Sequence, residues 1–157
     1  HNIRRRRANV MFSFIPLQER HWPLIPDEGK PTLSAGTKGI VAVDEAEKLV
    51  AACTFDNWAF NSCQIHIYIA NPFVLKHGFA QEVFEYAFNT CGKGIVLGVT
   101  AADNLKALKF IKNIGLTEIF RIPDGYKDGV DFILTQLRKE DCRWINQNPR
   151  LNAIGAN

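Results

Sequence analysis

A short basic loop in the middle of the chain has the residue types of a phosphate-binding site. It consists of Lys76, His77, Gly78, Phe79 and Ala80. The next acidic residue is Glu82, so no carboxylate competes for the first free backbone donors. A helix that begins at such a loop directs unpaired N–H groups and the positive end of its dipole toward an anion. The same residues are equally consistent with an ordinary strand-to-helix connection that turns at a glycine.

The segments on either side of this loop have the periodicity of a strand and of a helix. Between Cys63 and Asn71 an alternation over Gln64, Ile65, His66, Ile67, Tyr68 and Ile69 predicts a half-buried strand that ends before Pro72. From about Gly78 onward, two i, i+4 rows predict an amphipathic helix, one formed by Phe79, Val83 and Ala87 and the other by Ala80, Phe84 and Phe88.

The rest of the chain predicts a mixed α/β or α+β domain with one parallel strand pair. Strands are expected at 11–15, 39–43, 48–55, 95–100, 116–122 and 130–137, and helical segments at 16–25 and from Asp103 or Asn104 to Gly115. The apolar run at 95–100 is expected to be a parallel strand covered on both faces. In the second helix Leu105, Leu108 and Ile111 are expected to face inward. The Pro-rich and Gly-rich stretch at 26–39 is expected to be a loop, either a lid or binding loop or a mobile connection.

Composition favours a single globular domain at 11–145. The chain has 157 residues, of which 46% are hydrophobic and 22% are charged, and it lacks the apolar run of about 18 residues that a membrane-spanning helix needs. Its four cysteines lie far apart and are interpreted as reduced thiols of a cytoplasmic protein, without a metal site.

The positive charge of the chain is concentrated at its start. The net charge is +3, and the four residues Arg4 to Arg7 supply four positive charges, so the remainder carries 3 − 4 = −1. Residues 1–10 are interpreted as a basic extension upstream of a natural start at Met11. An alternative is that the arginine run binds nucleic acid, the only nucleic-acid contact we expect. The Asn-rich tail at 146–157 is expected to be loosely ordered or packed on a neighbouring chain.

The order and spacing of several motifs resemble the GNAT superfamily of acetyl-CoA-dependent N-acetyltransferases, in particular its compact bacterial or phage-type members. The shared positions lie between Phe12 and Trp144 and comprise Pro72, the loop Leu75 to Ala80, Asn104, Ala107 and the pair Gly115-Leu116. Two positions depart from the family pattern. Leu75 stands where the family prefers Arg or Gln, and Ile111 stands where many members have a tyrosine that protonates the departing thiolate.

The resemblance implies a cofactor site as well as a fold. It implies a mostly antiparallel sheet with helices on both faces, in which two parallel strands splay apart and the pantetheine arm of acetyl-CoA occupies the gap. The arm would pair with the backbone between Ile67 and Asn71, including Ile69. The pyrophosphate would bind at Lys76, His77, Gly78, Phe79 and Ala80, and Asn104 would hold the arm from the other side.

Acetyl transfer requires a neutral amine, although a lysine amine has a pKa of about 10.4 and an α-amine one of about 8. His66 is the candidate base because it lies on the strand near the expected splay and histidine ordinarily titrates near neutral pH. Its alternative role is packing against the neighbouring strand. Tyr68 and Tyr126 are the candidate acids, and a backbone N–H of the same strand is expected to polarise the thioester carbonyl.

The sequence therefore predicts a cytoplasmic enzyme, bacterial or encoded by a phage, that transfers an acetyl group from acetyl-CoA to a primary amine. A protein or peptide acceptor is favoured over a small molecule, by resemblance alone. The competing prediction is a non-catalytic GNAT-like binding or virion-associated module, which Leu75 and Ile111 favour. A homodimer is a further expectation.

Overall fold

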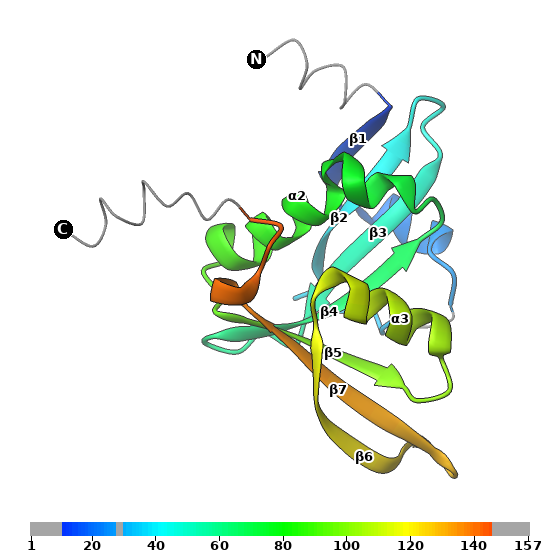
Figure 1. The fold of residues 1–157 in the computed structure, drawn as a ribbon. Helices are drawn as coiled ribbons and strands as arrows, with labels where there is room; N and C mark the ends of the chain where they lie inside the picture. The colour runs from blue at the N-terminus through cyan, green and yellow to red at the C-terminus, as the bar shows by residue number, and fades with distance from the viewer. Residues whose placement is uncertain (1–10, 28–29, 146–157) are drawn as a thin grey trace, which may run out of the picture.

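The computed structural model describes residues 11–27 and 30–145, which form one seven-stranded sheet in the order β1-β2-β3-β4-β5-β7-β6 (Figure 1). The basic extension and the C-terminal tail lie outside the described residues. The strands are β1 (Phe12–Pro16), β2 (Lys38–Asp44), β3 (Leu49–Asp56), β4 (Ser62–Ile69), β5 (Ile95–Ala101), β6 (Thr117–Lys127) and β7 (Val130–Arg138). All neighbouring strands in this sheet are antiparallel except β4 and β5. The predicted mixed, mostly antiparallel sheet is confirmed.

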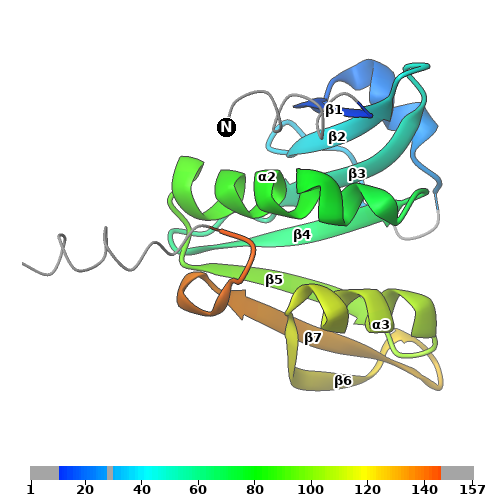
Figure 2. The ribbon, with the colours of Figure 1, turned by 45° about the horizontal axis from the view of Figure 1, so that its top comes forward.

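The parallel pair β4 and β5 stays together over only a short stretch. Its register contains three residue pairs, Ser62 with Ile95, Cys63 with Val96 and Gln64 with Leu97. Beyond these pairs β4 continues along β3 as far as Ile69, whereas β5 continues along β7 as far as Ala101. The two strands diverge, as Figure 2 shows, and the expected splay is confirmed.

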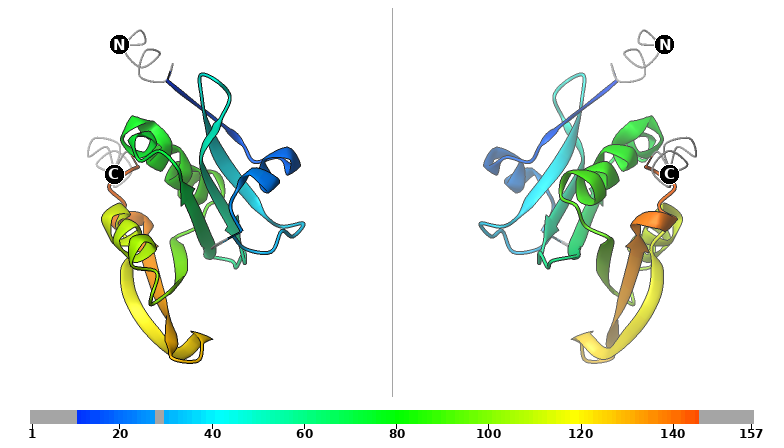
Figure 3. Two further views of the ribbon diagram at one scale, coloured as in Figure 1. Left: turned by 90° about the vertical axis from the view of Figure 1, so that its right-hand side faces the viewer. Right: turned by 90° about the vertical axis from the view of Figure 1, so that its left-hand side faces the viewer.

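Helices cover both faces of the sheet, as expected. The helix after β4 and α3 (Leu105–Ile114) lie on one face, and the 3-10 helix η1 (Glu19–Leu24) lies on the other (Figure 3). The main core lies under the first two helices and includes Cys53, Phe55, Ile65 and Val96. A smaller core under η1 contains Ile25, Val41, Leu49 and Ala52. The helical segment predicted at 16–25 is therefore shorter than expected, because Pro16 belongs to β1.

The helical region after β4 has three parts, and a kink at His77 and Gly78 interrupts the first of them. This region comprises a π-type turn η2 (Leu75–Phe79), α2 (Ala80–Glu85) and a second π-type turn η3 (Tyr86–Thr90). Both predicted rows of apolar residues are buried, with exposures of 0–2% for Phe79, Ala80, Val83, Phe84, Ala87 and Phe88. Their i, i+4 spacing places one continuous apolar stripe against the sheet, so this helix is the main cover of the core.

Two expectations about burial are wrong. Along β5 the side chains alternate, with Val96 and Thr100 buried and Leu97 half-buried, because no helix covers this part of the second face. In α3 the first residue, Leu105, is 74% exposed and does not face inward. It occupies the first turn, before the helix reaches the core at Ile111 and Ile114.

The described residues contain no helix that is both long and apolar enough to cross a membrane. All four cysteines are free, and three of them are buried. Burial raises the pKa of the Cys63 thiol to about 12, and burial also raises the pKa of Cys53 and Cys142. These three thiols therefore stay protonated and unreactive at neutral pH.

Asn104 is the N-cap of α3, because its side-chain Oδ1 accepts a hydrogen bond from the Ala107 N–H at 3.1 Å. Replacing it with alanine should lower the free energy of unfolding of the unliganded protein by about 1 kcal/mol. Urea unfolding measures this change. The neighbouring substitution Asp103→Ala is the control and should have almost no effect. An equal loss in both variants would contradict the assignment of the cap.

Candidate functional site

A cleft lies where β4 and β5 separate. Its volume is about 330 Å³, and it is bounded by β4 on one side and by α3 on the other. The lining residues are mostly apolar and comprise Pro26, Ile65, Ile67, Tyr68, Ile69, Asn104, Lys106, Ala107, Phe110, Ile111, Ile114 and Leu116. An elongated ligand with an apolar or amide-bearing chain fits such a slot better than a compact charged ligand does.

The edge of β4 that borders this cleft offers backbone hydrogen bonds. From Ile65 to Ile69 the strand pairs with β3 along its other edge. Within the described chain it has no strand partner on the cleft side, because the pairing with β5 ends at Gln64. An extended ligand with amide groups can add to such an edge as a further strand would. Ile69, predicted to bind the cofactor, lines the cleft, as does Asn104 on the opposite wall.

The predicted phosphate loop lies at a break between two helical pieces. A short helical turn at Leu75 precedes it, the backbone leaves helical geometry at His77 and Gly78, and α2 begins directly after this kink. At the kink His77 has φ −98° and ψ 21°, and Gly78 has φ 107° and ψ −5°. Such a right-handed and left-handed pair of residues directs successive N–H groups into one concavity, which binds anions. Only glycine adopts this φ readily, so the kink at Gly78 creates the concavity.

The other predicted residues of this loop have clear positions. Lys76 is exposed and remains available to an anion, whereas the His77 side chain turns back to the Phe73 carbonyl oxygen, with Nδ1 at 2.6 Å. Phe79 and Ala80 are 1% and 2% exposed, so only their backbone can take part in binding. The Asn71 side chain is engaged by the Phe73 N–H at 3.1 Å and does not line the cleft.

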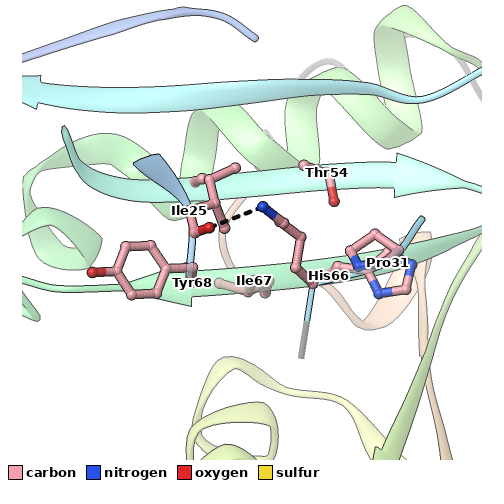
Figure 4. A pocket seen from close by; sticks show the side chains of 8 residues that line it. Ile25, Pro31, Thr54, His66, Ile67 and Tyr68 are labelled. Atoms are coloured by element: carbon pink, nitrogen blue, oxygen red, sulfur yellow. Dashed lines mark hydrogen bonds between the residues drawn. The ribbon is translucent and has the colours of Figure 1, made fainter. Parts of the chain in front are cut away.

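His66 lies on the opposite face of the sheet, beside a second and smaller pocket (Figure 4). Its Nε2 is 2.8 Å from Oδ1 of Asp56, and the two side chains are 16% and 13% exposed. The pocket has a volume of about 50 Å³ and is lined by Ile25, Lys30, Pro31, Ala52, Thr54, His66, Ile67 and Tyr68. The predicted loop at 26–39 therefore contributes Lys30 and Pro31 to the wall of this pocket.

Ile67 and Tyr68 line both the cleft and the smaller pocket. The two openings therefore approach the same section of β4 from opposite faces of the sheet. One ligand can reach this section along the cleft while another reaches it through the pocket beside His66. Tyr126, the other candidate acid, lines neither opening and packs against Phe132 at a ring distance of 5.7 Å.

Sequence reasoning missed two polar residues that line the small pocket, Thr54 and Lys30, and Asp56, which contacts His66 beside it. Asp56 was assigned to a turn, although it is the last residue of β3. Thr54 lies directly opposite His66 in the β3–β4 register, and its buried Oγ1 has no hydrogen-bond partner in the described chain. Lys30 donates to the carbonyl oxygens of Trp22 and Ile25, both at 3.1 Å. The alternation of β3 could have placed Thr54 and Asp56 on one face, but not next to His66.

The comparisons with known proteins give matches in structure alone. No family model matches the chain, and no curated protein sequence does. Among solved structures, a spermidine/spermine N-acetyltransferase SpeG from Vibrio cholerae in complex with manganese ions aligns with a TM-score of 0.64 and 14% identity, over 93% of this chain and 98% of that one. A mutant of the same enzyme aligns with a TM-score of 0.67 and 12% identity, over 83% of this chain and 95% of that one. A dodecameric form of the enzyme in an intermediate state aligns with a TM-score of 0.62 and 14% identity, over 84% of this chain and 96% of that one.

The chain has the GNAT fold. The GNAT resemblance inferred from the motifs is confirmed at the level of the fold, over nearly the whole of the matched chains. The residues that the structure describes contain no group of three or more His, Cys, Asp or Glu side chains that could hold a metal ion.

The unpaired hydroxyl of Thr54 has a testable effect on stability. Burying a hydroxyl without a partner costs about 1–3 kcal/mol. The substitution Thr54→Val should therefore leave the free energy of unfolding unchanged or raise it by up to about 2 kcal/mol. Thermal and urea unfolding would measure it.

The matched control for Thr54→Val is Thr135→Val. Thr135 is also buried, but its hydroxyl donates to the Gly98 carbonyl oxygen at 3.4 Å. The free energy of unfolding of this variant should be about 1 kcal/mol lower than that of the wild type. If Thr54→Val loses as much as the control, the Thr54 hydroxyl has a partner and the assignment is wrong.

Proposed function

We propose that the protein is an N-acetyltransferase that moves an acetyl group from acetyl-CoA to a primary amine. The observation that supports this proposal most is the meeting of two openings at Ile67 and Tyr68 on β4. A transfer between two substrates requires that each reach the reacting atoms without displacing the other. The cleft provides room for the acetyl donor, and the pocket beside His66 provides room for the amine.

The residues of the cleft fit the chemical groups of acetyl-CoA, whose thioester supplies the acetyl group. The edge of β4 from Ile67 to Ile69 is the proposed partner of the pantetheine amides, and Asn104 is their proposed neighbour on α3. The backbone concavity at His77 and Gly78, with Lys76 beside it, is the proposed pyrophosphate site. Lys106 lines the cleft and is available to the adenosine phosphates.

The proposed reaction uses His66 as the base and Tyr68 as the acid. His66 takes a proton from the amine, the amine nitrogen bonds to the thioester carbonyl carbon, and the carbon–sulfur bond breaks. The departing thiolate receives a proton from Tyr68, which regains one from solvent. A β4 backbone N–H polarises the carbonyl oxygen during this transfer. Tyr68 is proposed over Tyr126 because only Tyr68 lines the two openings.

The acceptor is proposed to insert one narrow aminoalkyl chain into the small pocket. A chain of this kind occurs in polyamines and in lysine side chains. The structural neighbours are described as spermidine N-acetyltransferases, which makes a small polyamine the first acceptor to test and moves a protein or peptide amine to second place. Of the residues that line the pocket, Lys30 forms an ion pair with the exposed Asp27, and His66 is hydrogen-bonded to Asp56. Any further amines of a polyamine would therefore lie outside the pocket.

A non-catalytic binding module is the second candidate function. Ile111 lines the cleft at the position where many family members have the acid tyrosine, so that proton donor is missing from this wall. The module would bind acetyl-CoA or a similar ligand without turnover.

Nucleic-acid binding through Arg4 to Arg7 and a homodimer both stay predictions, and the arginine run lies outside the described residues.

Calorimetric titration of acetyl-CoA tests the cofactor site. We expect micromolar binding by the wild-type protein and at least about a tenfold loss, or 1.4 kcal/mol, in Gly78→Glu, which places a carboxylate beside the pyrophosphate. The control is Gly92→Glu, because Gly92 also has a positive φ of 68° but has open space around it and lines neither opening. Equal losses in the two variants, or no binding by the folded wild type, would refute the site.

Release of free thiol from acetyl-CoA tests the reaction. We expect turnover with an amine from a panel of spermidine, short diamines and peptides with a free α-amine or a lysine. The substitution His66→Gln should lower kcat by about 10²-fold or more, because it removes the base, while acetyl-CoA affinity stays unchanged. Acetyl-CoA binding without turnover on any amine would favour the non-catalytic module.

A further inference from the structure

The contact between Asp56 and His66 joins two strands on the face of the sheet that the amine would approach. Asp56 ends β3, and His66 lies in the middle of β4, diagonally across the ladder from it. Their side-chain atoms Oδ1 and Nε2 are 2.8 Å apart. Both side chains are largely buried, so water competes little for this hydrogen bond.

The hydrogen bond fixes which nitrogen of His66 carries the proton. An ionised carboxylate only accepts hydrogen bonds, so Nε2 must donate and therefore holds the hydrogen of the neutral imidazole. The lone pair is then on Nδ1. No hydrogen bond to Nδ1 is present in the described part of the chain, so this atom is free to accept a proton.

The other charged and titratable groups around His66 leave this arrangement undisturbed. Lys30 lines the same pocket, but its ammonium group is bound by the Trp22 and Ile25 carbonyl oxygens and lies 3.3 Å from a carboxylate oxygen of Asp27. Tyr68, two residues along β4, lies on the same face of the strand. Among the described residues, Asp56 is the carboxylate that contacts His66.

We propose that Asp56 is a positioning residue, which holds His66 as the Nε2–H tautomer so that Nδ1 is the atom that takes the proton from the acceptor amine. Asp56 stabilises the resulting imidazolium through the same hydrogen bond and does not itself take up the proton. The role rests on the proposed function, since it assumes that His66 is the base. If the role were purely structural, the pair would only join the end of β3 to the middle of β4 and would not affect the proton transfer.

A double-mutant cycle distinguishes a positioning role from a structural one. The variants are Asp56→Asn, His66→Gln and the pair together, with Asp128→Asn in the β6–β7 turn as the control for loss of a carboxylate. We expect Asp56→Asn to lower kcat by about tenfold or more with little change in the KM for acetyl-CoA, because the asparagine amide can donate to Nε2 and place the hydrogen on Nδ1. In the His66→Gln background the same substitution should cause no further loss.

Equal losses from Asp56→Asn with and without His66 would overturn the proposal, because the carboxylate would then act independently of the imidazole. The proposal would also be overturned if Asp56→Asn lowers the melting temperature and its kcat returns to the wild-type value when the assay temperature is lowered. The Asp128→Asn control should retain wild-type kcat.

Nitrogen-15 spectra of the imidazole rings test the tautomer without any turnover. We expect a hydrogen on Nε2 and an unprotonated Nδ1 for His66 at a pH where the ring is neutral, with the His66→Gln spectrum identifying its signals. In Asp56→Ala the ring should relax to a mixture of both tautomers. A hydrogen on Nδ1 in the wild type, or an unchanged ring in Asp56→Ala, would overturn the proposal. If the wild type turns over no amine, the proposed function fails, and these spectra alone decide whether Asp56 sets the tautomer.

Discussion

The early separation of β4 and β5 is the constraint on which the rest of the site depends. A parallel pair normally continues its ladder for the length of both strands, but this pair ends after three residues. Beyond this point Ile65, Ile67 and Ile69 line a cleft whose other wall contains Phe110 of α3. At the same place the backbone edge of β4 loses its strand partner and its N–H and C=O groups become available to a ligand. A binding surface and a set of hydrogen-bonding groups therefore arise from one interruption of the sheet.

The pleat of β4 connects this cleft to the opposite face. Because successive side chains of a strand point to opposite faces, His66 and Tyr68 lie on the side of η1 while the isoleucines lie on the side of α3. A single strand can thus present a donor site on one face and an acceptor site on the other.

The fold tolerates large changes in sequence because the constraints on it are mostly apolar and geometric. Proteins with 12–14% identity to this chain share its fold. Burial of an apolar helix stripe and the alternation of strands can be met by many side chains of similar size. The small pocket is different, because its hydrogen bond between Asp56 and His66 depends on the identity and the position of both residues.

The sequence by itself determined the strands and the amphipathic helix after β4, and it limited the cap of α3 to Asp103 or Asn104, because each depends on residues near one another in the chain. It also identified Gly78 as a turning point and His66 and Tyr68 as residues on one face of a strand. Only the tertiary structure decided that a short helical turn precedes the kink at Gly78 and that Leu105 is exposed. It also brought Asp56, Thr54 and Lys30 to His66. Strand register and the docking of a loop place these groups together, and both depend on packing between distant segments, which local periodicity does not contain.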